Sequence, residues 1–213
     1  MDVKHIISKI INAWDHINDS IQDLIWGINT QKQMESTSFE TFSESLQHAK
    51  KYQATRYCTL RKIRSSLNID FGKYTFIDFG SGKGRVVIAA SKWGLKNVTG
   101  VEFAKNLHLS AKNNLEQFLS RSKKSTAPIT FIHLDAINYK IPTGPNIYFF
   151  YNPFREDVLR KVITNILENA THPSEDIFIY VNPRYGYIFE ELNLKQTVYI
   201  PNRNFNKVVK ITI

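Results

Sequence analysis

The stretch FIDFGSGKGRVV, residues 76–87, decides the fold. An apolar run typical of a buried strand leads into Gly80, Gly82 and Gly84, and a second apolar run follows them. Glycine weakens the interior of a strand or a helix, so three glycines this close together predict a sharp turn or a close approach to a large group. Asp78 adds a carboxylate to the end of the strand, just before the turn.

Strand and helix patterns alternate after this point. Parallel strands are predicted at 74–79, 97–103, 129–134, 146–152 and 176–182, and helices at 84–94, 104–120 and 155–170. The nearly all-apolar NIYFFYN, residues 146–152, is typical of a strand that is covered on both faces. Residues 194–200 and 207–213 alternate in polarity and predict a hairpin. The sequence therefore predicts an α/β fold with a doubly wound, mostly parallel seven-stranded sheet and a C-terminal antiparallel hairpin.

The first third of the chain predicts helices that precede this sheet. Apolar residues recur at three- and four-residue steps between residues 3 and 28 and gather on one helical face. We expect this face to pack against the rest of the domain, with homodimerisation or a membrane surface as the alternatives. The polar residues 29–38 predict a linker. Helical character returns over residues 39–67, with buried positions expected at Phe39, Phe42, Leu46, Ala49, Leu60, Ile63 and Leu67.

Composition indicates a globular protein with one well-filled core, because 42% of the 213 residues are hydrophobic. The net charge of +9 keeps nucleic acid open as a partner, although the basic residues are scattered. The single cysteine, Cys58, forms no internal disulfide and fits a reducing cytoplasm. We find neither a signal peptide nor a run of about 18 apolar residues, and the histidines show no metal-ligand spacing. We therefore expect a cytoplasmic protein with no metal and no stable membrane insertion.

The predicted strand ends carry the residues that would bind a ligand. Ligands of parallel α/β sheets collect at the carboxyl ends of the strands, so Gly80, Ser81 and Gly82 are the expected contacts. Glu102 ends the next predicted strand, about 20 residues beyond the glycines, where a carboxylate can accept both hydroxyls of a ribose. An arginine would suit a 2′-phosphate instead. This pattern predicts a cofactor of the adenosine type without a 2′-phosphate.

Two classes of cofactor share this geometry. A nicotinamide oxidoreductase would show G-x-G-x-x-G, whereas this chain has G-x-G-x-G. Asp78, two residues before the first glycine, would repel a pyrophosphate and attract an ammonium group. A ligand with adenosine at one end and an amino acid at the other suits both acids, and S-adenosylmethionine is such a ligand.

The sequence resembles the class I (Rossmann-like) S-adenosylmethionine-dependent methyltransferases over about residues 50–213. DFGSGKG, residues 78–84, looks like their first motif, and GVEF, residues 100–103, resembles the segment with their ribose-binding acid. HLDA, residues 133–136, is similar to the segment that meets the adenine. The resemblance thus implies cofactor contacts by Phe103, Asp135 and Ala136. By itself, Asp135 fits a helix N-cap equally well.

FFYNPF, residues 149–154, resembles the Asn/Asp-Pro-Pro-aromatic segment of amino-group methyltransferases. The resemblance implies that Asn152 and Tyr151 position the acceptor nitrogen and that Pro153 and Phe154 contact the substrate. The second proline of the motif is missing, which counts against methylation of a nucleic-acid base. A plain strand terminator is the alternative, because Asn-Pro recurs at residues 182–183.

YQATRYCTLRKI, residues 52–63, resembles a Tyr-x-x-Thr segment of Dot1-like and other protein-lysine methyltransferases and of uncharacterised bacterial members. In these enzymes the segment covers the methionine end of the cofactor, which implies contacts by Tyr52 and Thr55. Helix packing is the alternative explanation. We accordingly expect a helical extension and lid over residues 1–67 and an S-adenosylmethionine-binding domain over residues 68–213.

These observations predict a methyltransferase that acts on an amine nitrogen of a protein or a small molecule. Displacement at a sulfonium methyl needs alignment rather than a catalytic triad. An oxygen or carbon acceptor would require a base, and His133, Asp135 and Tyr185 are the candidates. The other readings are a methyltransferase of RNA or other nucleic acid, a non-catalytic Rossmann-like binding module and, least favoured, a nicotinamide oxidoreductase.

Overall fold

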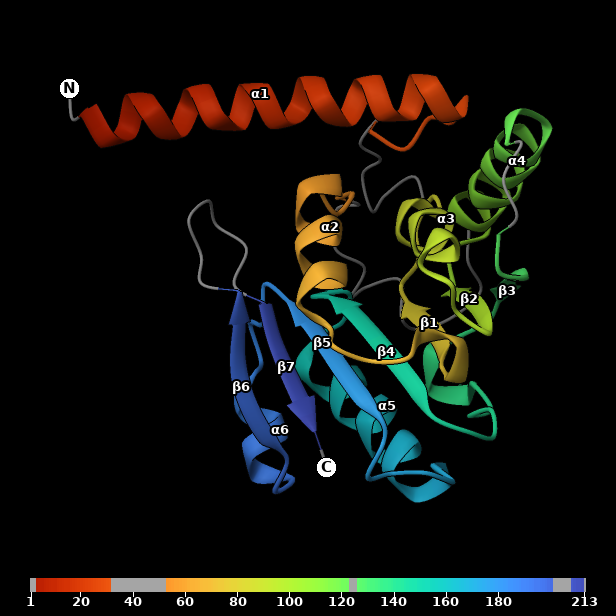
Figure 1. Ribbon diagram of the computed structural model, residues 1–213. Helices are drawn as coiled ribbons and strands as arrows, with labels where there is room; N and C mark the ends of the chain where they lie inside the picture. Colours follow the sequence, from red (N-terminus) through yellow and green to blue (C-terminus); the bar gives the residue numbers. More distant parts are fainter. Residues whose placement is uncertain (1–2, 32–52, 123–125, 201–207, 213) are drawn as a thin grey trace.

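The computed structural model describes residues 3–31, 53–122, 126–200 and 208–212 (Figure 1). Its sheet is built on five parallel strands in the order β3-β2-β1-β4-β5. Their bounds are β1 Thr75–Phe79, β2 Asn97–Glu102, β3 Ile129–His133, β4 Asn146–Tyr151 and β5 Ile177–Val181. Next to β5, β7 (Val208–Thr212) runs antiparallel, and β6 (Lys195–Ile200) pairs antiparallel with β7 at the edge. The predicted α/β class with a parallel sheet is confirmed.

Helices cover both faces of the sheet. The α-helices are α1 Val3–Trp26, α2 Tyr57–Ser66, α3 Arg85–Ala90, α4 Lys105–Arg121, α5 Glu156–Asn169 and α6 Tyr187–Glu191, and the short 3₁₀ helices are η3 Phe71–Lys73, η4 Ser91–Trp93 and η5 Ala136–Asn138. Side chains of α2 and α3 fill the core on one face, and side chains of α5 and α6 fill the core on the other. The short helices η3 and α6 are not apparent from the sequence pattern.

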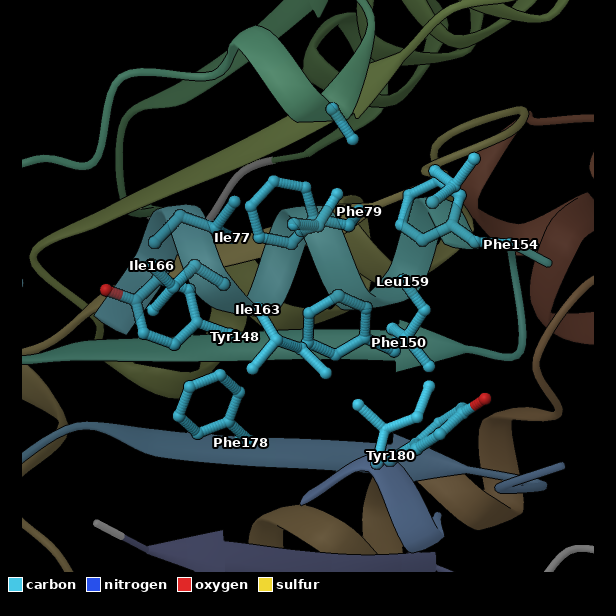
Figure 2. Close-up of a cluster of buried hydrophobic side chains, with 14 of the residues drawn as sticks. Ile77, Phe79, Tyr148, Phe150, Phe154, Leu159, Ile163, Ile166, Phe178 and Tyr180 are labelled. Carbon is cyan, nitrogen blue, oxygen red and sulfur yellow. The ribbon is translucent and has the colours of Figure 1, made fainter. Parts of the chain in front are cut away.

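The central strand β4 shows why its sequence is apolar throughout. Ile147 and Phe149 belong to the core beneath α2 and α3. Tyr148 and Phe150 point into the core beneath α5 (Figure 2). All four side chains are fully buried. Successive side chains of a strand face opposite sides, so a strand with helices on both faces needs no polar positions. The prediction of a doubly covered strand is confirmed.

The turn between β1 and α3 has the sharp backbone that its glycines predict. Gly80, Gly82 and Gly84 have φ of 78°, 54° and 85°, a region that other residues enter at a cost. The N–H groups of Gly80 and Ser81 both donate to the carbonyl of Val101, at 2.9 and 3.1 Å. The turn is thereby attached to β2, the neighbouring strand, and lies at the carboxyl edge of the sheet.

The long helix α1 does not pack as its pattern predicts. Its polar side faces the body of the protein, where Asp19 and Asp23 are 4% and 5% exposed. In the part of the chain that the structure describes, the opposite side faces outward, and we call it the apolar face of α1: Ile6, Ile7, Ile10, Ile11, Trp14, Ile17, Ile21, Leu24 and Ile25. The expected packing against the domain is therefore wrong for these nine residues within the described ranges, whereas Ile28, the last residue of the predicted face, is buried with Ile88 and Phe118.

The second predicted helical region is only partly described. The helix α2 begins at Tyr57, and Leu60, Ile63 and Leu67 are buried as predicted. The other predicted core positions, Phe39, Phe42, Leu46 and Ala49, lie outside the described residues. Within the described ranges, no helix combines the length and the apolar character that crossing a membrane requires.

Candidate functional site

A cavity of about 930 Å³, including space that is open to solvent, lies at the carboxyl ends of β1, β2 and β4. It brings together most of the predicted site residues: Thr55, Asp78, Gly80, Ser81, Gly82, Glu102, Phe103, Tyr151, Asn152, Pro153 and Phe154. An adjoining cavity of about 410 Å³ is lined by Asp135 and Ala136 and shares Gly80, Phe103, Pro153 and Phe154 with the first. Tyr52 lies outside the described residues.

Glu102 links the end of β2 to the glycine turn. Its Oε2 accepts a hydrogen bond from the Gly82 N–H at 2.8 Å, and its Oε1 accepts one from the Ala104 N–H at 2.9 Å. Burial raises the pKa of Glu102 to about 7, although these backbone hydrogen bonds oppose the shift. The carboxylate is thus held in place at the wall of the cavity, yet it is only partly ionised at neutral pH.

Asp78 places a second carboxyl group in the same cavity. It is 3% exposed, and its pKa is raised above its usual range, first by burial and then by the negative charge of Glu102. Two buried acids with raised pKa values favour a ligand with positive charge, because such a ligand stabilises the ionised form. This arrangement suits an ammonium or sulfonium group and disfavours a pyrophosphate.

Two more residues of the turn, Ser81 and Gly80, border the cavities. Ser81 lines the larger cavity, and its Oγ is buried without a hydrogen-bond partner among the described residues. Gly80 packs against the protein itself, since a Cβ at this position would lie 2.6 Å from the Cβ of Pro153. The absence of a side chain at Gly80 therefore lets the β1 turn approach the segment after β4, and Ser81 presents an unsatisfied hydroxyl beside it.

The segments after β4 and β5 have the same unusual backbone. Asn152 and Asn182 have φ of 45° and 53°, and both line the larger cavity. Strain of this kind in residues other than glycine is concentrated at functional sites. The Tyr180 hydroxyl donates to Oδ1 of Asn152 at 3.3 Å and holds its amide in place. The sequence pattern predicts only a strand terminator at Asn182, and the pairing of β4 with β5 brings this residue to the same edge as Asn152.

Arg85, which was not predicted as a site residue, lines the larger cavity from the start of α3. Its buried guanidinium donates to Asp19 at 3.2 Å and to Asp23 at 3.1 Å, and its Nε donates to Thr30 at 2.6 Å. We call these four residues and Tyr57 the Arg85 cluster, since Tyr57 donates to both aspartates and its ring lies 4.6 Å from the guanidinium. One feature of the sequence could have identified Arg85 as a site residue: it is a charged residue in an otherwise apolar helical run.

The Arg85 cluster also reaches the predicted lid. Arg85 donates to the backbone carbonyl of Thr55 at 3.3 Å. Gln53 and Ala54, which were not predicted, line the larger cavity beside Thr55. A single buried cation therefore connects α1, α3 and the segment before α2 at the edge of the cavity.

The remaining candidates have structural partners. Oδ1 of Asp135 accepts from the Ile137 N–H at 3.1 Å, so the N-cap interpretation is confirmed for η5. Nε2 of His133 lies 2.9 Å from the Phe103 carbonyl, and neither His133 nor Tyr185 lines either cavity. Burial raises the pKa of Cys58, which favours an inert thiol. Among the described residues, no group of three or more His, Cys, Asp or Glu could hold a metal ion.

Comparison with known families identifies one that spans this site. The family described as "Histone methylation protein DOT1" matches residues 30–142, which contain the glycine turn and both acids. No curated protein matches the chain.

Many solved structures share the fold. An RNA methyltransferase from Salinibacter ruber in complex with S-adenosyl-L-homocysteine is 17% identical over 76% of this chain and 94% of its own, with a TM-score of 0.55. A precorrin-6y C5,15-methyltransferase from Geobacter metallireducens is 13% identical over 86% and 98%, with a TM-score of 0.56. A ribosomal protein L11 methylase from Lactobacillus delbrueckii is 13% identical over 72% and 76%, with a TM-score of 0.53. At these identities the likeness concerns the fold alone.

Proposed function

Because this chain belongs to the DOT1 histone methylation family, we propose that it methylates an amine nitrogen of a protein or, failing that, of a small molecule. The chain is an S-adenosylmethionine-dependent methyltransferase, and the prediction of this class over a nicotinamide oxidoreductase is confirmed. The observation that carries the placement of the cofactor is the pair of buried carboxyl groups, Asp78 and Glu102, at one cavity.

We place the cofactor across both cavities. Asp78 would receive its ammonium group, and Glu102 would accept the ribose hydroxyls while it keeps its bonds to the turn. The adenine would enter the smaller cavity beside Phe103, Asp135 and Ala136. Among the described residues the Ser81 hydroxyl has no hydrogen-bond partner, which supports this fit, because a buried polar group without a partner is costly unless a ligand supplies one.

The extension before residue 67 would complete this site. Thr55 and its unpredicted neighbours Gln53 and Ala54 line the cavity, which supports a lid over the methionine end. The hydrogen bond from Arg85 to the Thr55 carbonyl would hold this lid in place. The division into an extension, residues 1–67, and a cofactor-binding domain, residues 68–213, remains part of this proposal, as does the cytoplasmic location.

The chain's own residues would align the acceptor with the methyl group. S-adenosylmethionine supplies an electrophilic methyl on a sulfonium, and the reaction is an in-line displacement that needs proximity more than acid–base chemistry. Oδ1 of Asn152, which the Tyr180 hydroxyl orients, would accept an N–H of the acceptor. This contact, with the Tyr151 backbone, would turn the nitrogen lone pair inward. Pro153 and Phe154 would form the adjoining wall.

Isothermal titration with S-adenosylmethionine tests the placement of the cofactor. We expect micromolar binding by the native chain and a loss of at least tenfold in Asp78→Asn, with no binding of NAD. Asp157→Asn is the matched control, since Asp157 is an exposed acid in the first turn of α5. Equal affinity in both variants would contradict the role that we give to Asp78.

Transfer of labelled methyl groups into fractions of a cell lysate tests the acceptor. We expect the label in the protein fraction and its loss when Asn152 is replaced by Ala. The net charge of +9 favours RNA as the second candidate, because basic surfaces attract phosphate backbones. If the label appeared in the RNA fraction alone, RNA would replace protein as the preferred methyl acceptor.

A further inference from the structure

The apolar face of α1 exposes more apolar area than the isolated apolar residues that are common on protein surfaces. Its side chains are between 38% and 73% exposed, and Trp14, at its middle, is 65% exposed. Together they leave on the order of 900 Å² of apolar surface in water, close to the roughly 800 Å² that each partner buries in a stable interface. A face of this size is expected to be covered in solution.

The spacing of this face favours another helix as its cover. Alternate steps of three and four residues connect Ile7, Ile10, Trp14, Ile17, Ile21 and Leu24. This is the a/d pattern of a coiled coil, whose average repeat of 3.5 residues keeps the seam turned toward a partner helix. The helix has 24 residues, or about three heptads, which is long enough for such a seam.

The contacts of α1 with the body hold this seam outward. On the opposite side of the helix, Asp19 and Asp23 are anchored in the Arg85 cluster. Arg56 adds a hydrogen bond to the Asn12 carbonyl at 3.4 Å, and Trp26 packs edge-on against Phe118 of α4 at 5.4 Å. Figure 1 shows α1 along the outside of the molecule. Because all of these contacts lie away from the apolar seam, the seam is left for an intermolecular contact.

The charge of α1 argues against a membrane surface as the cover. Helices that lie on membranes carry Lys and Arg beside their apolar face. The basic residues of α1 are Lys4 and Lys9, whereas its acids are Asp15, Asp19 and Asp23. Its polar side is also occupied by the body and is not free for lipid headgroups. The α1 helix of a second copy can cover the apolar face through apolar contacts, which do not require Lys or Arg beside that face.

We propose that two copies of this chain associate through their α1 helices, with the heptad seam of one helix packed against that of the other. A two-fold dimer is the simplest closed assembly, since each copy then contributes the same surface. This inference does not rest on the proposed methyl transfer, because none of the seam residues lines either cavity.

Light scattering after size-exclusion chromatography tests the dimer. The measurement covers total protein concentrations of about 1–100 µM, which is on the order of the dissociation constants of typical dimers. We expect twice the 24.7 kDa mass of one chain. Ile10→Glu with Ile17→Glu places charges in the seam and should raise the dissociation constant by at least about 100-fold. These side chains are exposed in the single chain, so the variant should fold and still bind S-adenosylmethionine.

The matched control introduces the same residue twice on the same helix but away from the seam, as His5→Glu with Lys9→Glu, both exposed. It should remain dimeric. A native chain that stays monomeric or forms larger assemblies would overturn the proposal, as would a dimer that survives the seam variant. Flotation of monomeric native chain with vesicles of anionic phospholipid would overturn it in favour of a membrane surface.

Discussion

At the scale of single residues, the two buried acids of the cavity set a pH dependence. Glu102 has a pKa of about 7 against a usual 4.5, and the pKa of Asp78 is raised as well. A cationic cofactor that binds the ionised forms must displace protons below neutral pH. We expect affinity for S-adenosylmethionine to fall as the pH drops below 7, by about tenfold per unit for each proton displaced.

Calorimetry measures how the affinity for S-adenosylmethionine depends on pH. A range of about pH 5.5 to 8.5 extends roughly one to two units on either side of the pKa of Glu102. Two buffers with different ionisation enthalpies should reveal proton release near pH 7. Glu102→Gln is the control, and it should bind more weakly with a flatter pH profile. An affinity that does not change with pH would show that neither acid changes its ionisation on binding.

The raised pKa values of these acids make the ligand-free protein less stable as the pH rises, which is opposite to their effect on cofactor affinity. Between pH 4.5 and about 7, the folded state holds a proton on Glu102 that the unfolded state has lost. The contribution of this group to stability therefore decreases as the pH rises through that window. Thermal unfolding with and without S-adenosylmethionine should show the difference, since bound cofactor makes the ionised pair favourable. A cofactor-induced rise in melting temperature that is equal at about pH 5, within this window, and at about pH 8, above it, would contradict this expectation.

A single methyl group at Gly80 should disrupt the turn. The Gly80→Ala variant combines a strained φ of 78° with a Cβ that lies 2.6 Å from the Cβ of Pro153. We expect a loss of about 3 kcal/mol in the free energy of unfolding, and weaker cofactor binding. Gly94→Ala is the control, because Gly94 has a φ of 86° but open space around its Cβ position. It should cost only about 1–2 kcal/mol in urea unfolding. Equal costs would mean that contact with Pro153 is unimportant.

At the scale of elements, the Arg85 cluster attaches α1 to the body. Removing Arg85 leaves Asp19 and Asp23 buried without their cation, so Arg85→Met should lower stability by about 3–5 kcal/mol. The triple variant with Asp19→Asn and Asp23→Asn should recover part of this loss, since no unpaired charge stays buried. Urea unfolding measures the stability, and limited proteolysis reports the release of α1.

The exposed pair between Arg160 and Glu191, 2.7 Å apart, is the control for this experiment. Arg160→Met should leave the unfolding midpoint nearly unchanged, because water solvates both charges when they separate. Comparable losses from Arg85→Met and Arg160→Met would contradict the anchoring role of the buried cluster. So would an Arg85→Met variant in which α1 stays as resistant to protease as in the native chain.

At the scale of the whole molecule, the parallel topology assembles the site. The ends of β1, β2, β4 and β5 meet at one edge, so Asp78, Glu102, Asn152 and Asn182 line one cavity although they are far apart in sequence. The same edge receives the segment before α2 through the hydrogen bond from Arg85 to Thr55. Strand order thus brings the proposed cofactor and acceptor residues to one edge, and the Arg85 hydrogen bond holds the proposed lid beside them.

Local pattern by itself determined the α/β class, the glycine turn and the acids at the strand ends. These features depend on residues that are neighbours in sequence. The apolar run of β4 indicates that the strand is buried on both faces, and Gly80 indicates a positive φ that residues with a side chain rarely adopt. Asn182 could be recognised as part of the cavity only from the pairing of β4 with β5.

Only the tertiary structure decided which side of α1 faces the body. Periodicity identifies an apolar face, but it cannot say what covers that face. Here Asp19 and Asp23 meet Arg85, a residue more than 60 positions away in sequence. A paired and hydrogen-bonded buried cluster turns the polar side inward and the apolar side outward, because its charges must stay together once they are removed from water.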